Sequence, residues 1–318
     1  MARFVFLTKT RWDEPPRLRH QLAELLARAG HEVLFFEKPG APWKMPRERA
    51  SPVKGIRLLE CGELIHHRLR IGPVARAANA LCASASISRA LRDRGIGEDD
   101  VIVNFNYDYW FLRRLFPGSP IVTVINDDFV TTAPRMLQGS LAKAQRMTCT
   151  GSDAVLTPSV ALQEQLSVHS PAELFLPWAD VGYEQPPRSR DRNAIFYWGY
   201  IGRRLDFPLL ERLAAELALS APDMTLEFHG PVEGDAGSQP LFSRFANVRL
   251  RGAAKLAEIE LDRMAASIIP YVRGVPEVDV IVMPNKAMQL LARGIPLLIS
   301  GMPRFETRSE EHTSELQS

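Results

Sequence analysis

The stretch Ala194-Ile-Phe-Tyr-Trp-Gly-Tyr-Ile-Gly-Arg-Arg-Leu-Asp206 shows the organisation of the chain most clearly. Its first part, Ala194–Trp198, is apolar and rich in aromatic residues, which is typical of a β-strand. Two glycines and two arginines follow in a turn, and a helix is expected near residues 207–219. A strand, a glycine turn and a helix in this order indicate a parallel α/β sheet.

Downstream of this stretch the same alternation continues. Further strands are expected at residues 225–229, 248–250, 267–269 and 296–299. Further helices are expected near residues 256–265 and 286–293. The pattern predicts a Rossmann-like domain over residues 194–307, with right-handed crossovers between its parallel strands.

Upstream, the first half of the chain alternates in the same way. Its strands are expected at residues 4–8, 32–36, 56–60, 101–105, 121–125, 154–157 and 174–176. Its helices are expected at residues 17–29, 74–92, 136–149 and 160–166, with a short one after Tyr107. We therefore expect an α/β fold with two tandem Rossmann-like domains: residues 1–180, a Pro- and Arg-rich linker at 181–193, and residues 194–307.

Composition excludes several classes of protein. The 318 residues are 46% hydrophobic and 24% charged, which is typical of a soluble globular protein. A net charge of +2 gives no polybasic signal, so no nucleic-acid partner is expected. The three cysteines show neither a metal-binding spacing nor a disulfide framework, which fits the cytoplasm. No apolar run approaches the roughly 20 residues that span a bilayer.

Residues 308–318, Arg-Ser-Glu-Glu-His-Thr-Ser-Glu-Leu-Gln-Ser, differ in character from the rest. They follow an apolar strand abruptly and have no hydrophobic period. The string resembles the translation of a sequencing-library adapter, and the alternative is an ordinary polar tail. We expect authentic sequence to end near Thr307, which would leave the second domain truncated and the chain unstable or inactive.

Several segments resemble the GT-B nucleotide-sugar glycosyltransferases of the large retaining family 4. In the second half these are residues 196–206, Leu226-Glu-Phe-His-Gly-Pro231, Asn247-Val-Arg-Leu-Arg-Gly252 and Met283-Pro-Asn-Lys-Ala-Met-Gln-Leu-Leu-Ala-Arg-Gly-Ile-Pro296. In the first half, residues 12–33, 154–166 and 176–180 are similar to the family's opening and last strands. The resemblance implies metal-independent, retaining hexosyl transfer from a nucleotide-diphosphate sugar to a saccharide or lipid-linked acceptor, without a cofactor. Polysaccharide biosynthesis is the common setting.

Four residues of the glycine turn are candidates for donor binding. Gly199 and Gly202 allow the backbone to approach a diphosphate where a Cβ would clash. The alternative is that both glycines serve turn geometry alone. Arg203 and Arg204 follow the turn, where a guanidinium can donate two hydrogen bonds to phosphate oxygens. The alternative is a pair of solvated surface arginines.

The segment Pro284-Asn285-Lys286 opens a helix and supplies further donor-binding candidates. The N-terminus of a helix presents unpaired N–H groups and a positive dipole end to anions, and Lys286 adds a charge. The alternative is a surface lysine on a first turn. Gln289 stands where the family usually has a glutamate that accepts the ribose hydroxyls. Glutamine keeps an acceptor oxygen but loses the charge, and Ile281 stands where a companion glutamate is expected.

On the acceptor side, Asp127 and Asp128 follow the strand expected at residues 121–125. Carboxylates at the carboxyl end of a strand are candidates for catalytic base work on an acceptor hydroxyl, and the alternative is a helix N-cap. They do not form a DxD metal motif, so no metal is expected. The aromatic residues of 104–110 stack on a sugar or pack in the core. His20 lies in a helical stretch, where a structural role is the alternative.

Three other functions compete with glycosyl transfer. A non-hydrolysing sugar-nucleotide epimerase shares the fold but usually has more acidic and histidine residues in its cleft. A non-catalytic saccharide-binding protein is favoured by Gln289 and by the missing end. An oxidoreductase is disfavoured because no Gly-x-Gly-x-x-Gly follows either first strand. Weak contact with the inner face of the plasma membrane through basic residues of 68–76 is a further expectation, with a surface charge cluster as the alternative.

Overall fold

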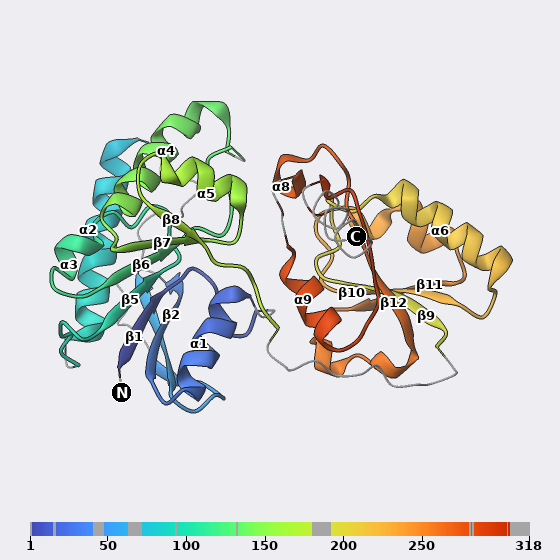
Figure 1. Cartoon of the computed structure of the whole chain (residues 1–318), viewed down its shortest axis with the longest axis horizontal. Coiled ribbons are helices and arrows are strands. Elements are labelled where there is room, and N and C mark those ends of the chain that lie inside the picture. The colour runs from blue at the N-terminus through green and yellow to red at the C-terminus, as the bar shows by residue number, and fades with distance from the viewer. Residues whose placement is uncertain are drawn as a thin grey trace, which may run out of the picture. The chain divides into compact units, whose positions relative to one another are not determined.

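The computed structural model describes residues 2–14, 17–40, 48–62, 72–92, 94–131, 133–179, 192–279, 281, 283–303 and 305. The chain divides into two compact units, Met1–Leu176 and Pro177–Ser318 (Figure 1). Residues 181–191 of the expected linker and the whole of 308–318 lie outside the described residues.

The first unit is built on an eight-stranded sheet in the order β3-β4-β2-β1-β5-β6-β7-β8. All neighbours are parallel except β3, which runs antiparallel to β4. The strands are β1 (Arg3–Leu7), β2 (Glu32–Gly40), β3 (Glu48–Ala50), β4 (Ile56–Gly62), β5 (Val101–Asn104), β6 (Ile121–Val124), β7 (Ala154–Thr157) and β8 (Ala172–Leu174). The helices are α1 (Leu18–Arg28), α2 (Pro73–Leu91), α3 (Leu112–Leu115), α4 (Arg135–Thr150) and α5 (Val160–Ser167).

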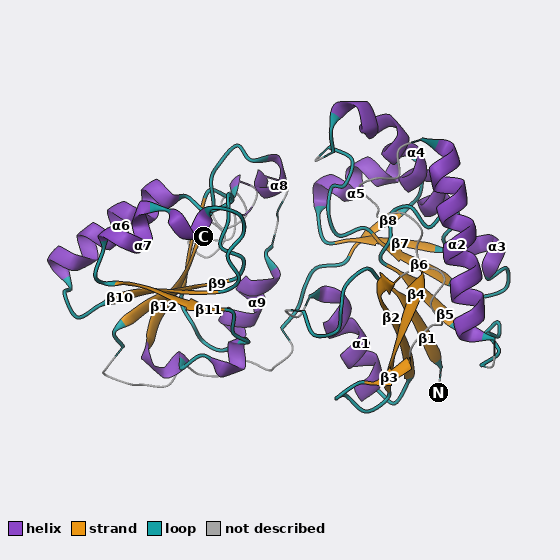
Figure 2. Cartoon of the chain, turned by 180° about the vertical axis from the view of Figure 1, so that it is seen from behind, coloured by secondary structure: helices purple, strands orange, loops and turns teal. Residues whose placement is uncertain are grey.

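Side-chain alternation along β1 explains how helices cover both faces of this sheet. Successive residues of a strand face opposite sides. Val5 and Leu7 pack with Ala83 and Ile87 of α2 in one core cluster. Phe6 faces the other side, where it stacks on Phe35 of β2, and Phe35 in turn contacts His20 of α1. Figure 2 shows α1 and α2 on opposite sides of the sheet.

The second unit has a five-stranded, wholly parallel sheet in the order β11-β10-β9-β12-β13. Its strands are β9 (Ala194–Trp198), β10 (Thr225–His229), β11 (Val248–Gly252), β12 (Met264–Pro270) and β13 (Leu297–Ser300). Its α-helices are α6 (Phe207–Ser220), α7 (Pro240–Arg244), α8 (Pro276–Asp279) and α9 (Asn285–Ala292). Helix α6 begins at Phe207 because the Asp206 side chain accepts a hydrogen bond from the Leu209 amide at 2.9 Å.

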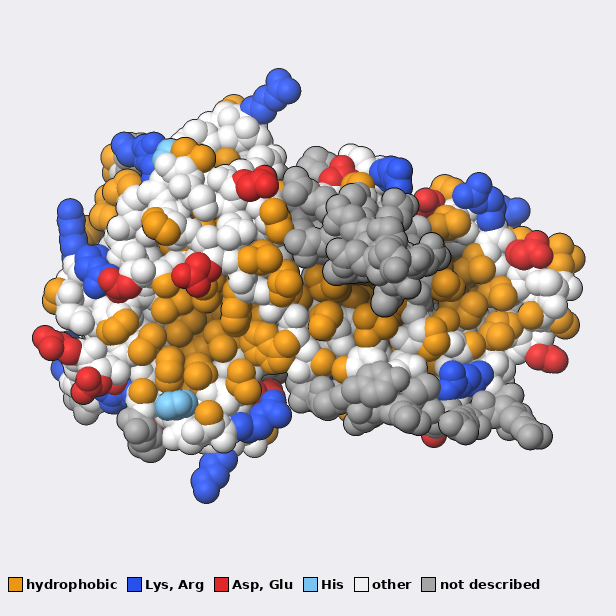
Figure 3. Space-filling model, in the orientation of Figure 1, with side chains coloured by type: hydrophobic (Ala, Val, Ile, Leu, Met, Phe, Trp, Pro, Cys, Tyr) orange, Lys and Arg blue, Asp and Glu red, His pale blue; other side chains and the backbone are white. Residues whose placement is uncertain are grey.

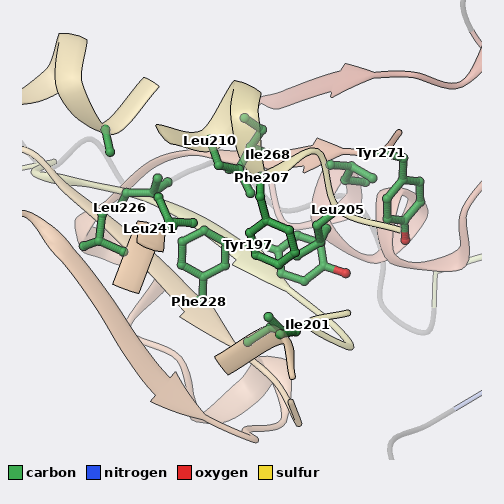
Figure 4. Close-up of a cluster of buried hydrophobic side chains, with 14 of the residues drawn as sticks. Tyr197, Ile201, Leu205, Phe207, Leu210, Leu226, Phe228, Leu241, Ile268 and Tyr271 are labelled. Carbon is green, nitrogen blue, oxygen red and sulfur yellow. The ribbon is translucent and has the colours of Figure 1, made fainter. Parts of the chain in front are cut away.

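Figure 4 shows the main core cluster of this unit, which fills one side of the sheet. Leu226 and Phe228 of β10 and Leu210 of α6 are fully buried in it. Tyr197, Leu205 and Tyr271 lie together at one end of the cluster (Figure 4). This end borders the turn that follows β9, so the core positions the aromatic residues of the candidate site.

The structure differs from the sequence-based expectation most clearly at residues 256–265. The expected helix is replaced by two short 3-10 turns, Leu256–Glu258 and Leu261–Arg263, and by the start of β12 at Met264. Met264 pairs with Ala194 of β9, and Leu256 is buried in a core cluster with it. Strand pairing and core packing therefore decide the structure of this segment, and its helical propensity does not.

The surface of the first unit has no single charged patch on the face shown in Figure 3. Hydrophobic side chains gather over its middle, and Lys, Arg, Asp and Glu side chains lie mainly toward its edges (Figure 3). Strand β3, which the sequence did not predict, lies at the edge of the sheet with exposed Glu48 and Arg49. Charged side chains are a common protection of edge strands. Among the described helices none is long and apolar enough to cross a membrane.

Candidate functional site

The candidate donor side begins at the carboxyl end of β9, where the chain turns at Gly199. The φ angle of Gly199 is 143°, a conformation that favours glycine. A Cβ added there would lie 2.5 Å from Nζ of Lys286 and 3.1 Å from the hydroxyl of Tyr197. The turn and the lysine therefore approach each other so closely that only glycine leaves room between them.

Lys286 lies on the first turn of α9, directly after Asn285, at which the helix begins. The N-cap residue is Pro284, and no side chain caps the helix there. The Oδ1 atom of Asn285 is buried, and none of the described residues forms a hydrogen bond with it. Within the described part of the chain, no carboxylate forms an ion pair with the half-buried Lys286 ammonium. The N-terminus of α9 and the Lys286 ammonium therefore both contribute positive potential at this point, and no described carboxylate pairs with the ammonium.

Two buried tyrosines surround the Lys286 ammonium. Nζ donates a hydrogen bond to the Tyr197 hydroxyl at 3.0 Å and lies 4.3 Å from the centre of that ring. It also lies 5.3 Å from the centre of the Tyr271 ring. Burial lowers the pKa of Lys286, whereas the charges and hydrogen bonds of both tyrosines raise it, and the net direction is upward. Lys286 is therefore a cation at neutral pH.

Arg203 and Arg204 lie in the turn after β9 and are exposed. The backbone oxygen of Arg204 accepts a hydrogen bond from the Val272 amide at 2.9 Å, next to Tyr271. Burial raises the pKa of Tyr271, while Lys286, Tyr197 and Arg204 lower it, and the net direction is downward. Arg204 thus lies close enough to act on the same cluster. We call Gly199, Tyr197, Arg204, Tyr271 and Lys286 the lysine site.

Gly202 lies against an acidic side chain and not against the lysine. A Cβ at Gly202 would lie 2.8 Å from Oε2 of Glu233. Glu233 is exposed, and its flexible side chain end occupies the space over the glycine. The glycine therefore admits the glutamate here, and a ligand that needs this space must displace that carboxylate.

Gln289 is buried, with 6% of its surface exposed, and both ends of its amide are engaged by the chain. Nε2 donates to the backbone oxygen of Trp178 at 3.2 Å. Oε1 accepts from Nη1 of Arg293 at 3.1 Å. The side chain therefore holds the approach of Trp178 to α9. Oε1 keeps a second lone pair and Nε2 a second hydrogen, so a ribose hydroxyl would share the amide with these two bonds.

Glu227 is a buried carboxylate of the second unit that the sequence did not single out. Arg251 donates to both of its oxygens, at 3.1 and 3.0 Å, and Arg263 donates to Oε1 at 3.1 Å. Burial raises the pKa of Glu227, but the hydrogen bonds and charges of the two arginines lower it by more. The net pKa is about 2. His229 lies 3.3 Å from Oε2, and burial lowers the pKa of that imidazole. The network joins β10, β11 and the turn before β12.

We predict that Glu227→Gln lowers the free energy of unfolding at pH 7 by about 2 kcal/mol, because neutral glutamine loses charge-assisted hydrogen bonds. The folded-state pKa, about 2, is below the ordinary value of 4.5. The stabilisation by the ionised carboxylate is therefore complete above about pH 5 and is lost as the pH falls toward 2. Urea unfolding across this range should show the variant and the wild type converging.

Glu211→Gln is the matched control, because the Glu211 pair with Arg244 is solvent-exposed on the arginine side, where 65% of the side chain is accessible. Such a pair is worth less than about 1 kcal/mol. An equal loss of stability in both variants, or a Glu227→Gln difference that does not change with pH, would show that the buried network does not stabilise this unit.

In the first unit, Asp127 and Asp128 follow β6 but have different surroundings. Asp128 is 7% exposed, and its carboxylate accepts hydrogen bonds from the Val130 amide and from the amide and hydroxyl of Thr131. Asp127 is exposed, and its carboxylate accepts from Nδ2 of Asn126 at 2.8 Å. Helix α4 is capped by Pro134, so neither aspartate is the helix N-cap that was the alternative. Asp128 instead closes a turn, and Asp127 is the accessible carboxylate.

The aromatic residues after β5 pack into the core. Tyr107 and Tyr109 are 6% and 2% exposed, and Tyr107 stacks on Phe129 at 4.7 Å. Lys9 lies over both tyrosine rings and donates to Asp108 at 3.0 Å. These tyrosines therefore pack in the core, which was the alternative to stacking on a sugar.

His20 is structural. Its Nδ1 accepts from the Arg17 amide at 3.0 Å, and its Nε2 lies 3.1 Å from the backbone oxygen of Arg11. Because Nδ1 is an acceptor, the ring proton belongs on Nε2. Burial lowers the pKa of His20 to about 4, so the ring is neutral at neutral pH.

Sequence reasoning missed the tyrosines of the lysine site and the buried Arg19 of α1. Tyr197 belongs to an expected strand with no sign of a binding role, and Tyr271 follows β12 without a motif. Arg19 is 7% exposed, and no pattern in the sequence around it predicts that an arginine is buried there. The alternation of strand residues could have indicated Tyr197. The other two depend on contacts between segments far apart in the chain. Among the described residues, no group of three or more His, Cys, Asp or Glu side chains is placed to hold a metal ion.

Comparison of the sequence with models of protein families gives no match, and comparison with curated proteins gives none. Several solved structures are similar in fold. Alpha,alpha-trehalose-6-phosphate synthase from Burkholderia multivorans matches with a TM-score of 0.62 and 11% identity, over 96% of this chain and 83% of that one. The lipopolysaccharide outer core galactosyltransferase WaaB matches with a TM-score of 0.52 and 12% identity, over 94% and 80%.

A third similar structure, trehalose-6-phosphate from E. coli bound with UDP-2-fluoro glucose, has a TM-score of 0.57 and 11% identity, over 94% of this chain and 84% of that one. At such low identity the likeness concerns the fold. The fold class is that of the GT-B glycosyltransferases, with two Rossmann-like units of parallel α/β structure. The fold expected from the sequence is confirmed.

Proposed function

We propose that this protein transfers a sugar from a nucleotide-diphosphate donor to a hydroxyl group of an acceptor. One observation carries the proposal: the Lys286 ammonium lies at the N-terminus of α9, against the Gly199 turn, without a carboxylate partner among the described residues. A diphosphate leaving group is negatively charged and would supply the counter-charge to the Lys286 ammonium. The fold of the similar structures supports the same class of reaction.

The second unit would bind the donor through the lysine site. Gly199 permits close approach of the backbone, and Lys286, the first amides of α9 and Arg204 stabilise negative charge as it develops on the diphosphate. Arg203 lies on the same turn and would contact the outer phosphate oxygens. Such a set of charges replaces a metal ion in neutralising the leaving group, so metal-independent transfer belongs to the proposal.

Gly202, Pro284, Asn285 and Gln289 complete the proposed donor side. Pro284 and Asn285 begin α9, and the buried Asn285 oxygen has no partner to compete for it. Gln289 would shape the nucleotide site indirectly, by holding Trp178 and Arg293. Because Gln289 lacks the charge of the glutamate that the family usually has here, a non-catalytic saccharide-binding protein is the second candidate function.

The first unit would bind the acceptor, and Asp127 would accept the proton of the acceptor hydroxyl. Asp128 would position Asp127 through the turn that it closes. Retention of configuration and the family 4 type rest on the motif resemblance. A saccharide or lipid-linked acceptor, a role in polysaccharide biosynthesis and weak contact with the inner face of the plasma membrane belong to the proposal on the same ground. Of the basic segment 68–76, residues 68–71 lie outside the described residues, and Arg76 donates to the backbone oxygen of Ser140.

The proposal is tested by titrating the full chain with UDP, GDP and ADP by calorimetry, and by incubating it with the corresponding sugar nucleotides. Saturable binding together with release of the nucleoside diphosphate supports glycosyl transfer. Binding without turnover supports the saccharide-binding alternative. Conversion of the sugar without release of the nucleotide supports an epimerase. If none of the three nucleotides binds, the lysine site is not a donor site.

The two aspartates are predicted to respond differently to substitution by asparagine. Asp127→Asn should lower the turnover of the donor by about 100-fold, the lower range for removal of a general base, with an unchanged melting temperature. Asp128→Asn should lower the stability of the first unit by about 1 kcal/mol, because it weakens the turn hydrogen bonds. Turnover and thermal melts of both variants separate the roles. Equal turnover in Asp127→Asn and the wild type would remove Asp127 from the mechanism.

A further inference from the structure

Arg19 is a buried cation that forms no ion pair among the described residues. It lies on the first turn of α1 and is 7% exposed. Its only hydrogen bond among the described residues runs from Nη1 to Oγ1 of Thr10, at 2.5 Å. Its Nε atom is buried and has no hydrogen-bond partner in the described part of the chain. Burial lowers the pKa of Arg19 to about 10, so the guanidinium is nevertheless charged at neutral pH.

Other arginines of the first unit show how unusual this is. Arg3 pairs with Asp100, Arg49 with Glu37, and Arg113 with Asp153, and all three arginines are more exposed than Arg19. A buried charge without a partner is costly, because it loses hydration and gains little in return. The most buried guanidinium of this group therefore has the weakest compensation within the chain.

Arg19 lies near the carboxyl ends of β1 and β5. Its guanidinium lies 5.4 Å from the centre of the Phe105 ring, directly after β5, and Thr10 lies in the loop after β1. Open α/β sheets bind their ligands at this carboxyl edge. The charges that act on Arg19 are those of Arg17, Asp127 and Glu14, so the accessible aspartate of the proposed acceptor side lies nearby. The N-terminus of α1 adds positive potential.

The alternative to ligand binding is that Arg19 only stabilises the fold, by packing on the Phe105 ring. A cation–π contact at a buried site is worth about 2 kcal/mol, which is less than the cost of an unpaired buried charge. Its Nε donor also has no hydrogen-bond partner among the described residues, so packing on Phe105 compensates the guanidinium only in part. The geometry is therefore better suited to a group that arrives with its own negative charge.

We propose that Arg19 binds an anionic group of the acceptor, a phosphomonoester or a carboxylate, with Thr10 at its side. This inference rests on the proposed function, because it assigns the acceptor to the edge of the sheet where Asp127 lies. The anion would accept hydrogen bonds from the guanidinium, and its sugar ring would extend toward Asp127. The acceptor class is thus a charged saccharide and not a neutral one.

The first test uses inorganic phosphate as the probe and the full chain labelled with 15N-arginine. Phosphate should shift the Nε–H signal of Arg19 saturably, whereas chloride at equal ionic strength should not. Arg19→Met should lower the affinity for phosphate at least tenfold, and Arg19→Lys should lower it less, because lysine keeps the charge but loses the forked donors. Arg28→Gln, an exposed change at the other end of α1, is the control. No saturable shift in the wild type would overturn the proposal.

A second measurement separates a ligand-binding arginine from a structural one. If Arg19 is an uncompensated charge, Arg19→Met should leave the melting temperature in chloride unchanged or raise it. The same variant should lose the stabilisation that phosphate gives to the wild type. A strongly destabilised Arg19→Met protein that phosphate stabilises as much as it stabilises the wild type would show that Arg19 holds the fold and not the anion.

A final set of titrations identifies the source of the anion. Neutral sugars, their phosphomonoesters and the corresponding uronates are compared in wild type and Arg19→Met. The wild type should bind one charged series at least tenfold more tightly than the neutral sugars, and the variant should not distinguish them. Binding of phosphate alone, with no preference among the sugars, would overturn the acceptor assignment. Nucleoside diphosphate binding at Lys286 is measured separately, so a failure of the proposed function is visible independently.

Discussion

Replacing Lys286 by methionine is expected to weaken the binding of a nucleoside diphosphate by about 100-fold. Hydrogen bonds to charged groups contribute about 1.5–3 kcal/mol each, and the ammonium would supply at least one to the diphosphate. The methionine keeps the length and apolar stem of the side chain, so the packing against Tyr197 and Tyr271 changes little. Calorimetric titration of both proteins with the nucleotide that binds best measures the effect.

The stability of the Lys286→Met protein is a second readout of the same change. The ammonium lies between two aromatic rings without a carboxylate among the described residues, and its removal should therefore cost little folding free energy. Lys54→Met, an exposed substitution in the first unit, controls for the loss of one positive charge. Unchanged nucleotide affinity in Lys286→Met would rule out the lysine as a donor ligand. Equal weakening in both variants would attribute the effect to net charge.

Gly230→Ala is expected to damage the second unit severely. A Cβ at this position would lie 1.8 Å from the backbone oxygen of Gly199 and 2.6 Å from its carbonyl carbon. Neither atom belongs to a flexible side chain, so β10 and the Gly199 turn must separate. Overpacking of this kind costs about 3 kcal/mol, and the displaced turn should also weaken nucleotide binding. Urea unfolding and nucleotide titration measure the two effects.

Gly139→Ala is the control for Gly230→Ala. An added Cβ at Gly139 meets no atom within 4 Å, and the residue lies inside α4. Alanine is favoured over glycine in a helix by about 0.5–1 kcal/mol, so this variant should be slightly more stable than the wild type. If Gly230→Ala unfolded like the wild type, the close approach of β10 to the Gly199 turn would be wrong.

Local signals in the sequence determined the two sheets of this protein. The apolar runs that were expected to form strands do so at Ala194–Trp198 and Thr225–His229 with their predicted bounds. The sequence also indicated the glycine turn with Gly199 and the helix that begins beside Lys286. These features depend on neighbouring residues: apolar periodicity, β propensity and a capping aspartate act within a few positions of the chain.

Only the tertiary structure decided the chemistry of the candidate sites. Residues 256–265 have helical propensity, yet the pairing of Met264 with Ala194 turns their end into a strand. Lys286 stands out because Tyr197, Tyr271 and the Gly199 turn lie around it. Arg19 stands out because it is buried and, among the described residues, has only Thr10 as a hydrogen-bond partner. A side chain's burial and partners come from segments far apart in the sequence. Charge and hydrogen-bond compensation are sums over such long-range contacts, and no local pattern contains them.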